Sequence, residues 1–255
     1  MEMHLDSSLL IILIVFGFLA SFIDSVVGGG GLITLPTLLF TGLNPAVAVA
    51  TNKLASTIGS LTSTFMFYRS GKLDLKSVFK FFPLTFIGSL LGAYTVHLLN
   101  PELLKPLMLI MLAVVAIFTI FKKDWGSLSS PKKLPTYQFI IFLVTIFAIG
   151  FYDGFIGPGT GSFLIFSFLL IGFDFLKAAG NAKFLNFCSN IAGLMMFMFL
   201  GQVNYTYGII MGIAQIAGAI CGSKFAIKKG SGYVRTLFIS VTCLLLAKNV
   251  YDYFQ

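Results

Sequence analysis

The chain has 255 residues, of which 57% are hydrophobic and only 10% are charged, and its mean hydropathy is +0.96. Soluble globular domains have about 25% charged residues, so the composition excludes a soluble protein and predicts an all-α polytopic membrane protein. The net charge of +8 resembles that of nucleic-acid-binding proteins. Most Lys and Arg residues, however, lie in short clusters between apolar segments, as cytoplasmic loops require. We therefore expect a lipid bilayer around the protein and no nucleic-acid partner.

Five apolar segments are predicted in the first half, at residues 9–27, 31–42, 45–68, 79–98 and 103–121. Most approach the ~20 residues with which a helix crosses a ~30 Å hydrocarbon layer. The segment 31–42 would be only ~18 Å long at 1.5 Å per residue, which indicates a half-helix or a re-entrant piece. It follows the sequence DSVVGGGG at 24–31, in which four glycines interrupt an apolar run.

The second half begins after the only extended polar stretch, KKDWGSLSSPKKLP. We expect a cytoplasmic linker at 122–134 between two transmembrane domains, 1–121 and 135–255. Five more apolar segments follow, at 135–152, 161–172, 175–200, 206–223 and 235–251. The short one, 161–172, again follows a glycine-rich break, DGFIGPGTGS at 153–162.

The second half repeats the first at a nearly constant separation. Gly31, Lys53, Gly88 and Gly92 each have the same residue type 130 positions later, at Gly161, Lys183, Gly218 and Gly222. Aligning the two breaks requires a gap of one residue. Upstream of this gap the two halves are separated by 129 residues, as from Asp24 to Asp153. An aspartate and a lysine inside apolar segments thus recur at equivalent positions of the two halves, which predicts an internal duplication.

The loop charges predict that the two repeats are inverted. Arg69, Lys72, Lys76 and Lys80 flank one junction, whereas the equivalent junction at 201–206 has no Lys or Arg. The positive-inside rule then places the first junction in the cytoplasm and the second outside. Inverted repeats are common in secondary transporters. They require an odd number of crossings per half, so we expect ten segments with an external N-terminus. Eight segments would make the halves parallel, against the loop charges.

The two glycine-rich breaks are expected near the middle of the membrane. Non-helical backbone is tolerated there only where it is buried in protein or lines a wet cavity. The N-terminus of the short helix after each break carries free N–H groups and about half a positive charge, which favours an anion. The candidate donors are Gly29, Gly30, Gly31, Gly159, Thr160 and Gly161.

Two lysines, Lys53 and Lys183, lie well inside apolar spans. A lysine at the centre of a membrane helix costs ~2.5–3.5 kcal/mol on insertion scales, although snorkelling to the nearer interface is the alternative. At helical spacing, residues 52, 53, 56 and 60 share one face, as do 183, 186 and 190. This polar face indicates a lined path, whose candidate substrate-binding residues are Lys53, Lys183, Thr51, Asn52, Asn181 and Asn186.

Asp24 and Asp153 are the only acidic residues well inside apolar segments. Three roles are open to them: a proton carrier, a salt-bridge partner for the lysines, or a cap for the helix after the break. The three cysteines, Cys188, Cys221 and Cys243, are far apart in apolar runs and are expected to be small core or membrane-facing residues. With two histidines and no ligand motif, we expect no metal and no cofactor.

The segments IDSVVGGGGLITLPTLLFTGLNPAVAVATNKLAST and GFYDGFIGPGTGSF, with AAGNAKFLNFCSN, resemble the two signature halves of the TauE/SafE, or sulfite exporter, family. The resemblance covers residues 9–250. It implies a secondary carrier in the plasma (cell inner) membrane that exports small sulfur-containing anions. The family's intramembrane lysines would fall on Lys53 and Lys183. The second half departs from the first where Thr51-Asn52 becomes Asn181-Ala182, so the site need not be symmetric.

We therefore predict a transporter that exports sulfite or an organosulfonate by alternating access, and not an enzyme, because no nucleophile or cofactor motif is found. The alternatives are a passive anion channel or a permease for another small organic anion. A homodimer is compatible with the sequence.

Overall fold

The computed structural model describes residues 7–100, 102–104, 106–108, 110–111, 114 and 135–229, and the regular structure of these residues is helical. Most of the predicted segment 103–121, all of the linker 122–134 and of the segment 235–251, and Cys243 lie outside the described residues. The first half contains α1 (Ser7–Val27), α2 (Gly31–Phe40), α3 (Pro45–Arg69), α4 (Leu75–Val78), η1 (Phe79–Phe81) and α5 (Phe82–Leu98). The second contains α7 (Thr136–Phe155), α8 (Thr160–Leu170), α9 (Phe175–Phe199) and α10 (Tyr205–Lys229).

Five helical stretches are long and apolar enough to cross a membrane: α1, the stretch from Leu75 to Leu98, α7, α9 and α10. The helix α3 has the necessary length, with 25 residues, but is less apolar because it carries Lys53 and the polar residues around it. The short helices α2 and α8 have 10 and 11 residues. The structure thus agrees with the predicted long and short segments across the described chain.

Both predicted breaks interrupt the helices. α1 ends at Val27 and α2 begins at Gly31, with Gly28 between them at φ +86°. α7 ends at Phe155 and α8 begins at Thr160, with Gly157 and Gly159 at φ +93° and +80°. Glycine is the residue that adopts these left-handed conformations without strain, which is why both breaks are built from it.

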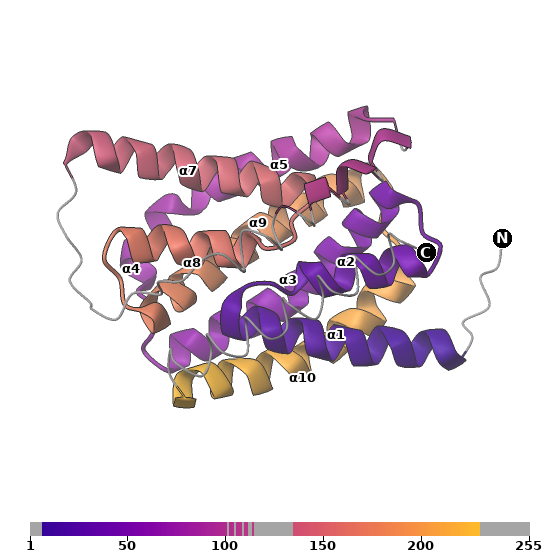
Figure 1. The fold of residues 1–255 in the computed structure, drawn as a ribbon, viewed down its shortest axis with the longest axis horizontal. Coiled ribbons are helices and arrows are strands. Elements are labelled where there is room, and N and C mark those ends of the chain that lie inside the picture. Colours follow the sequence, from indigo (N-terminus) through magenta and orange to yellow (C-terminus); the bar gives the residue numbers. More distant parts are fainter. Residues whose placement is uncertain are drawn as a thin grey trace.

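The helices pack in a crossed pattern (Figure 1). α1, from the first half, lies along α10, from the second, and α7 lies along α5 in the same way. α3 and α9 pack against each other, α3 also against α10, and α9 also against α5. Each contact therefore has a counterpart when equivalent helices of the two halves are exchanged.

Small residues allow the crossed pairs to approach closely. A Cβ on Gly88 or Gly92 of α5 would meet the backbone of Phe147 or Phe151 in α7 at 2.8 Å or less. The repeat counterparts, Gly218 and Gly222 of α10, are in the same relation to Phe18 and Phe22 of α1. This spacing of four residues is the small-xxx-small pattern of membrane helix pairs.

Equivalent helices of the two halves run in opposite directions in Figure 1. α1 begins at the right-hand end of the molecule and α7 at the left-hand end, while α3 and α9 are likewise opposed. α3 and α10, which end at Arg69 and Lys229, both finish at the left-hand end, where α4 also lies. The structure thus gathers two separate basic clusters of the sequence at one end of the molecule.

Candidate functional site

The two glycine-rich breaks touch each other at the centre of the site. The N–H of Ser162 donates to the carbonyl oxygen of Gly28 at 3.0 Å, and its hydroxyl donates to the carbonyl oxygen of Val27 at 2.8 Å. A Cβ on Gly31 would lie 2.8 Å from Cα of Pro158. Two segments 130 residues apart therefore meet through backbone atoms, which requires glycine at the contact.

Two ion pairs join the halves beside these breaks. Nζ of Lys53 lies 3.0 Å from Oδ2 of Asp153, and Nζ of Lys183 lies 2.7 Å from Oδ2 of Asp24. The lysine of α3 or α9 thus forms an ion pair with the aspartate that precedes the glycine-rich break of the other half. Of the three roles that the sequence left open for the aspartates, the structure shows the salt bridge for both.

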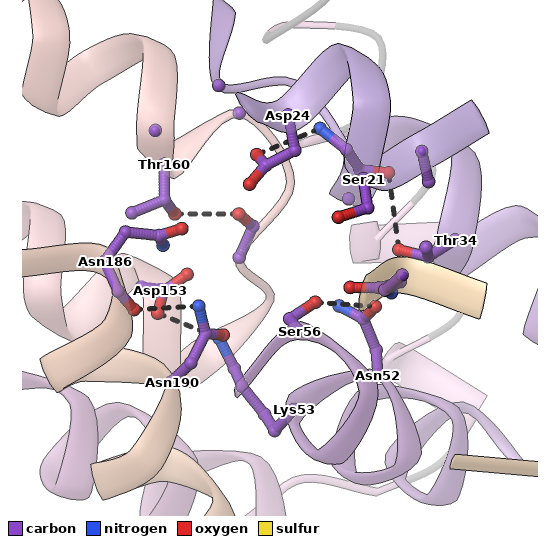
Figure 2. Close-up of a pocket in the computed structure, with 18 residues that line it drawn as sticks. Ser21, Asp24, Thr34, Asn52, Lys53, Ser56, Asp153, Thr160, Asn186 and Asn190 are labelled. Atoms are coloured by element: carbon purple, nitrogen blue, oxygen red, sulfur yellow. Dashed lines mark hydrogen bonds and ion pairs between the residues drawn. The ribbon is translucent and has the colours of Figure 1, made fainter. Parts of the chain in front are cut away.

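The Lys53 pair is sealed inside the protein. Its two side chains are 1% and 2% exposed, and the ammonium group also donates to Oδ1 of Asn190 at 3.3 Å. Figure 2 shows Lys53 reaching from α3 between Asp153 and Asn190. A Cβ on Gly157 would lie 2.9 Å from the ammonium nitrogen, so the second break is packed directly on this charge.

The Lys183 pair is more open on its acidic side. Lys183 is fully buried, whereas Asp24 is 22% exposed. Oδ1 of Asp24 accepts the N–H of Gly30 at 3.3 Å. Asp24 therefore combines two of the predicted roles, ion-pair partner and hydrogen-bond acceptor at the start of α2, and it occupies one of the N–H groups that we expected to be free for an anion.

A small polar cavity lies between the breaks and the two central helices. Its volume is about 20 Å³, room for about one water molecule. Its walls come from α1, α2, α3, α7, α8, α9, α10 and both breaks (Figure 2). The polar side chains in the lining are Ser21, Asp24, Thr34, Asn52, Lys53, Ser56, Asp153, Thr160, Asn186, Asn190 and Gln215.

Most of the residues predicted for the site do line this cavity. They include Lys53, Asn52, Asn186, both aspartates, and the break residues Gly30, Gly31, Gly159, Thr160 and Gly161. Lys183 is not part of the lining, but it forms an ion pair with Asp24, which is. Gly29 is not part of the lining.

Thr51 and Asn181 lie elsewhere, in equivalent structural positions. Oγ1 of Thr51 accepts the N–H of Asn204 at 3.1 Å, and Oδ1 of Asn181 accepts the N–H of Asp74 at 3.1 Å. Thr51 thus holds the turn before α10, and Asn181 holds the turn before α4, each in the opposite half of the chain. Two residues along a helix is a rotation of about 200°, so positions 51 and 181 face away from Lys53 and Lys183.

Sequence reasoning missed Ser21, Thr34 and Gln215, which all line the cavity. Gln215 is 4% exposed and is surrounded in α10 by apolar and small residues. A buried amide in such a helix was a usable signal, because polar groups inside membrane spans face the protein interior. Ser21 and Thr34 carried no such signal, because single hydroxyl residues are common in membrane helices.

Known proteins match the chain along nearly its whole length. Residues 13–249 match the protein family described as Sulfite exporter TauE/SafE. A "Probable membrane transporter protein" of Haemophilus influenzae is 37% identical over 251 residues, 98% of each chain. The "Probable membrane transporter protein YfcA" of Escherichia coli K12 is 36% identical over 245 residues, 96% of this chain and 90% of its own.

A more distant relative, the "Probable membrane transporter protein YunE" of Bacillus subtilis, is 25% identical over 270 residues, 95% of this chain and 99% of its own. No solved structure matches the fold. Together with the apolar helices, these matches make the protein a multi-pass membrane transporter. The chain belongs to the TauE/SafE family.

Proposed function

We propose that the protein is a secondary transporter that exports a small sulfur-containing oxyanion, sulfite or an organosulfonate, across the plasma membrane by alternating access. The observation that carries the proposal is the pair of Lys–Asp ion pairs that join the two halves where their glycine-rich breaks meet. Ionisable groups inside membrane spans mark transport pathways because their burial is costly. The family description supplies the cargo class.

The site is electrically balanced, with two lysines and two aspartates. An arriving anion therefore competes with a carboxylate for an ammonium group. Asp24 is the more exposed of the two carboxylates that line the cavity, so the anion replaces it beside Lys183. Neutral donors complete the binding site, among them the amides of Asn52 and Asn186, which lie on the cavity wall.

The closed form of the cavity supports a carrier. A space of about 20 Å³ is smaller than sulfite needs, so the walls must separate to admit it. Walls that open to one side at a time give alternating access, whereas a passive channel requires a continuous path. The contact between the breaks through Gly28 and Ser162 is the seal that opening must disturb.

The arrangement of the helices supports inverted halves and an external N-terminus. Equivalent helices are opposed in direction (Figure 1), and the basic ends of α3 and α10 lie together. The positive-inside rule assigns that end to the cytoplasm. With the cell interior negative, each negative charge moved outward gains ~2.3 kcal/mol per 100 mV, so export needs no ATP.

Flux into sealed vesicles tests the proposal. Proteoliposomes with purified protein should take up labelled sulfite or sulfoacetate saturably and exchange it against unlabelled anion. The variant Lys183→Gln should lose the flux, whereas Lys177→Gln, which removes an exposed lysine of the same helix, should retain it. An ohmic, non-saturating current would instead establish a channel, and saturable uptake of only non-sulfur organic anions would replace the cargo.

A further inference from the structure

A second cavity lies away from the central site and is much larger, with a volume of about 260 Å³. It is found where α4, the start of α7 and the end of α8 come together, at the left-hand end in Figure 1. This is the end that also holds the basic clusters. The lining residues are Ser77, Lys80, Phe81, Phe139, Phe142, Phe168, Ile171, Phe173 and Asn181.

The cavity contains a buried hydrogen-bond donor without an acceptor. Asn181 is 0% exposed, and its Oδ1 already accepts the N–H of Asp74. Its Nδ2 has no hydrogen-bond partner among the residues that the structure describes. Buried amide groups in native proteins are nearly always paired, so this donor points to a ligand that brings an acceptor.

The other polar groups of the lining also favour a ligand with a negatively charged hydrogen-bond acceptor. The ammonium group of Lys80 lies over the rings of Phe81 and Phe139, 5.0 and 5.8 Å from their centroids. The hydroxyl of Ser77 already donates to Asp74 at 2.6 Å. Among the described lining residues, the hydrogens left for a ligand thus belong to the ammonium group of Lys80 and the amide of Asn181, and the other side chains are phenylalanine and isoleucine.

The duplicated chain provides an internal comparison for this cavity. The positions equivalent to Ser77, Phe81, Phe142 and Phe168 are Tyr207, Met211, Leu13 and Leu38, at separations of 130 or 129 residues. These four side chains are 0–2% exposed and belong to one packed apolar cluster. The position equivalent to Asn181 is Thr51, which has no amide. In the first half the same place is filled by side chains, and the cluster there also contains Leu104 and Met108, whose repeat positions 234 and 238 lie outside the described residues.

We propose that the second cavity is a binding site for an organic anion with an apolar body. Lys80 and the free amide hydrogens of Asn181 bind its acidic group, and the phenylalanines enclose its hydrocarbon or ring. The site is separate from the central cavity, and the proposal does not depend on the transported substrate. A free organic acid and the headgroup and first carbons of an anionic lipid share this chemistry.

Binding of p-toluenesulfonate to the full-length protein in phosphatidylcholine nanodiscs tests the site. Lys80→Gln should weaken binding at least tenfold. Ser77→Tyr, which introduces the residue of the filled counterpart, should abolish it. Lys76→Gln removes an exposed lysine of α4 outside the lining and should leave binding unchanged. A monodisperse, cooperatively melting Ser77→Tyr protein confirms that the loss is local.

A second arm distinguishes the sources of the ligand. Nanodiscs that contain phosphatidylglycerol should suppress p-toluenesulfonate binding if the anionic lipid is the natural occupant, and should leave it unchanged if a free acid is. The proposal is overturned if p-toluenesulfonate does not bind, if it binds the wild type and both lining variants equally, or if Lys76→Gln weakens it as much as Lys80→Gln.

Discussion

The two ion pairs between Lys53 and Asp153 and between Lys183 and Asp24 have the same chemistry but different surroundings. Both members of the first are at most 2% exposed, whereas Asp24 of the second is 22% exposed. Removing one partner of a buried pair leaves an uncompensated charge and costs ~3–5 kcal/mol, while replacing both with apolar residues is often neutral. We therefore propose that the first pair is chiefly structural and that the second changes partners during transport.

We predict that Lys53→Met destabilises the protein by ~3–5 kcal/mol because Asp153 is left charged and unpaired. The double variant Lys53→Met/Asp153→Leu should recover most of this loss. Thermal unfolding of the detergent-purified proteins, followed by size-exclusion chromatography, measures both effects. Equal melting temperatures for the wild type and the single variant would show that the pair contributes nothing to stability.

For Asp24, we predict an effect on anion binding. Asp24→Asn removes the carboxylate that competes with the anion for Lys183, so the variant should bind methanesulfonate more tightly than the wild type at neutral pH, as measured by calorimetry. The other charges near this pair are Lys53 and Asp153, which lie across the cavity and form an ion pair with each other. Equal affinities of the wild type and the variant would show that Asp24 does not compete with the anion.

Residues of the site could be predicted from sequence where the polar face of a single helix marks them. Lys53, Asn52 and Asn186 could be found from their polar faces inside apolar segments. The pairing of Lys53 with Asp153, and of Lys183 with Asp24, could not, because each pair joins opposite halves and spacing within one half contains no such information. Thr51 and Asn181 were assigned to the substrate site because they are close to the lysines in sequence. Their positions around the helix, however, direct their side chains toward the loops that they hydrogen-bond.

At the scale of elements, the breaks between α1 and α2 and between α7 and α8 determine where the site lies. Gly28 is at φ +86°, and a Cβ there would lie 2.7 Å from Cα of Gly161. Gly28 is therefore required for two reasons, its left-handed backbone conformation and its close contact with the backbone of Gly161. The sequence predicted both interruptions because runs of glycine are expensive in a helix interior, but it did not indicate that the two breaks touch.

We predict that Gly28→Ala prevents correct assembly, and Gly71→Ala provides the matched control. Gly71 is also left-handed, at φ +69°, but a Cβ there would meet nothing within 4 Å. Its substitution should cost only the conformational term, about 1–2 kcal/mol. Fluorescence-detected size-exclusion chromatography of tagged variants separates the two, with a monodisperse peak expected for Gly71→Ala alone. Equally well-assembled variants would mean that the contact with Gly161 relaxes at little cost.

At the scale of the whole molecule, the halves are interlocked rather than side by side. α1 packs mainly on α10 and α7 mainly on α5, so the first helix of each half has its main partner in the other half. The repeat itself was visible in the constant separation of glycines and lysines. The crossed packing was not, because repetition in sequence does not say which copy of a helix is the partner.

We predict that the start of α10 and the helix α4 face opposite sides of the membrane. In a protein whose native cysteines have been replaced, Thr206→Cys should react with an impermeant maleimide added to whole cells. Lys76→Cys should react only after the membrane is permeabilised. Both positions are exposed, so reactivity reports the side of the membrane. Labelling of both positions in intact cells would favour parallel halves.

The packing of α1 on α10 also constrains biosynthesis. A ribosome finishes α1 long before it makes α10, so the first helix must wait in the lipid or in the insertion machinery without its partner. A product truncated after α5 would also leave Lys53 without Asp153, a marker of incompleteness that cellular quality control can detect. The protein is thus complete as a membrane structure only once almost the whole chain has been translated.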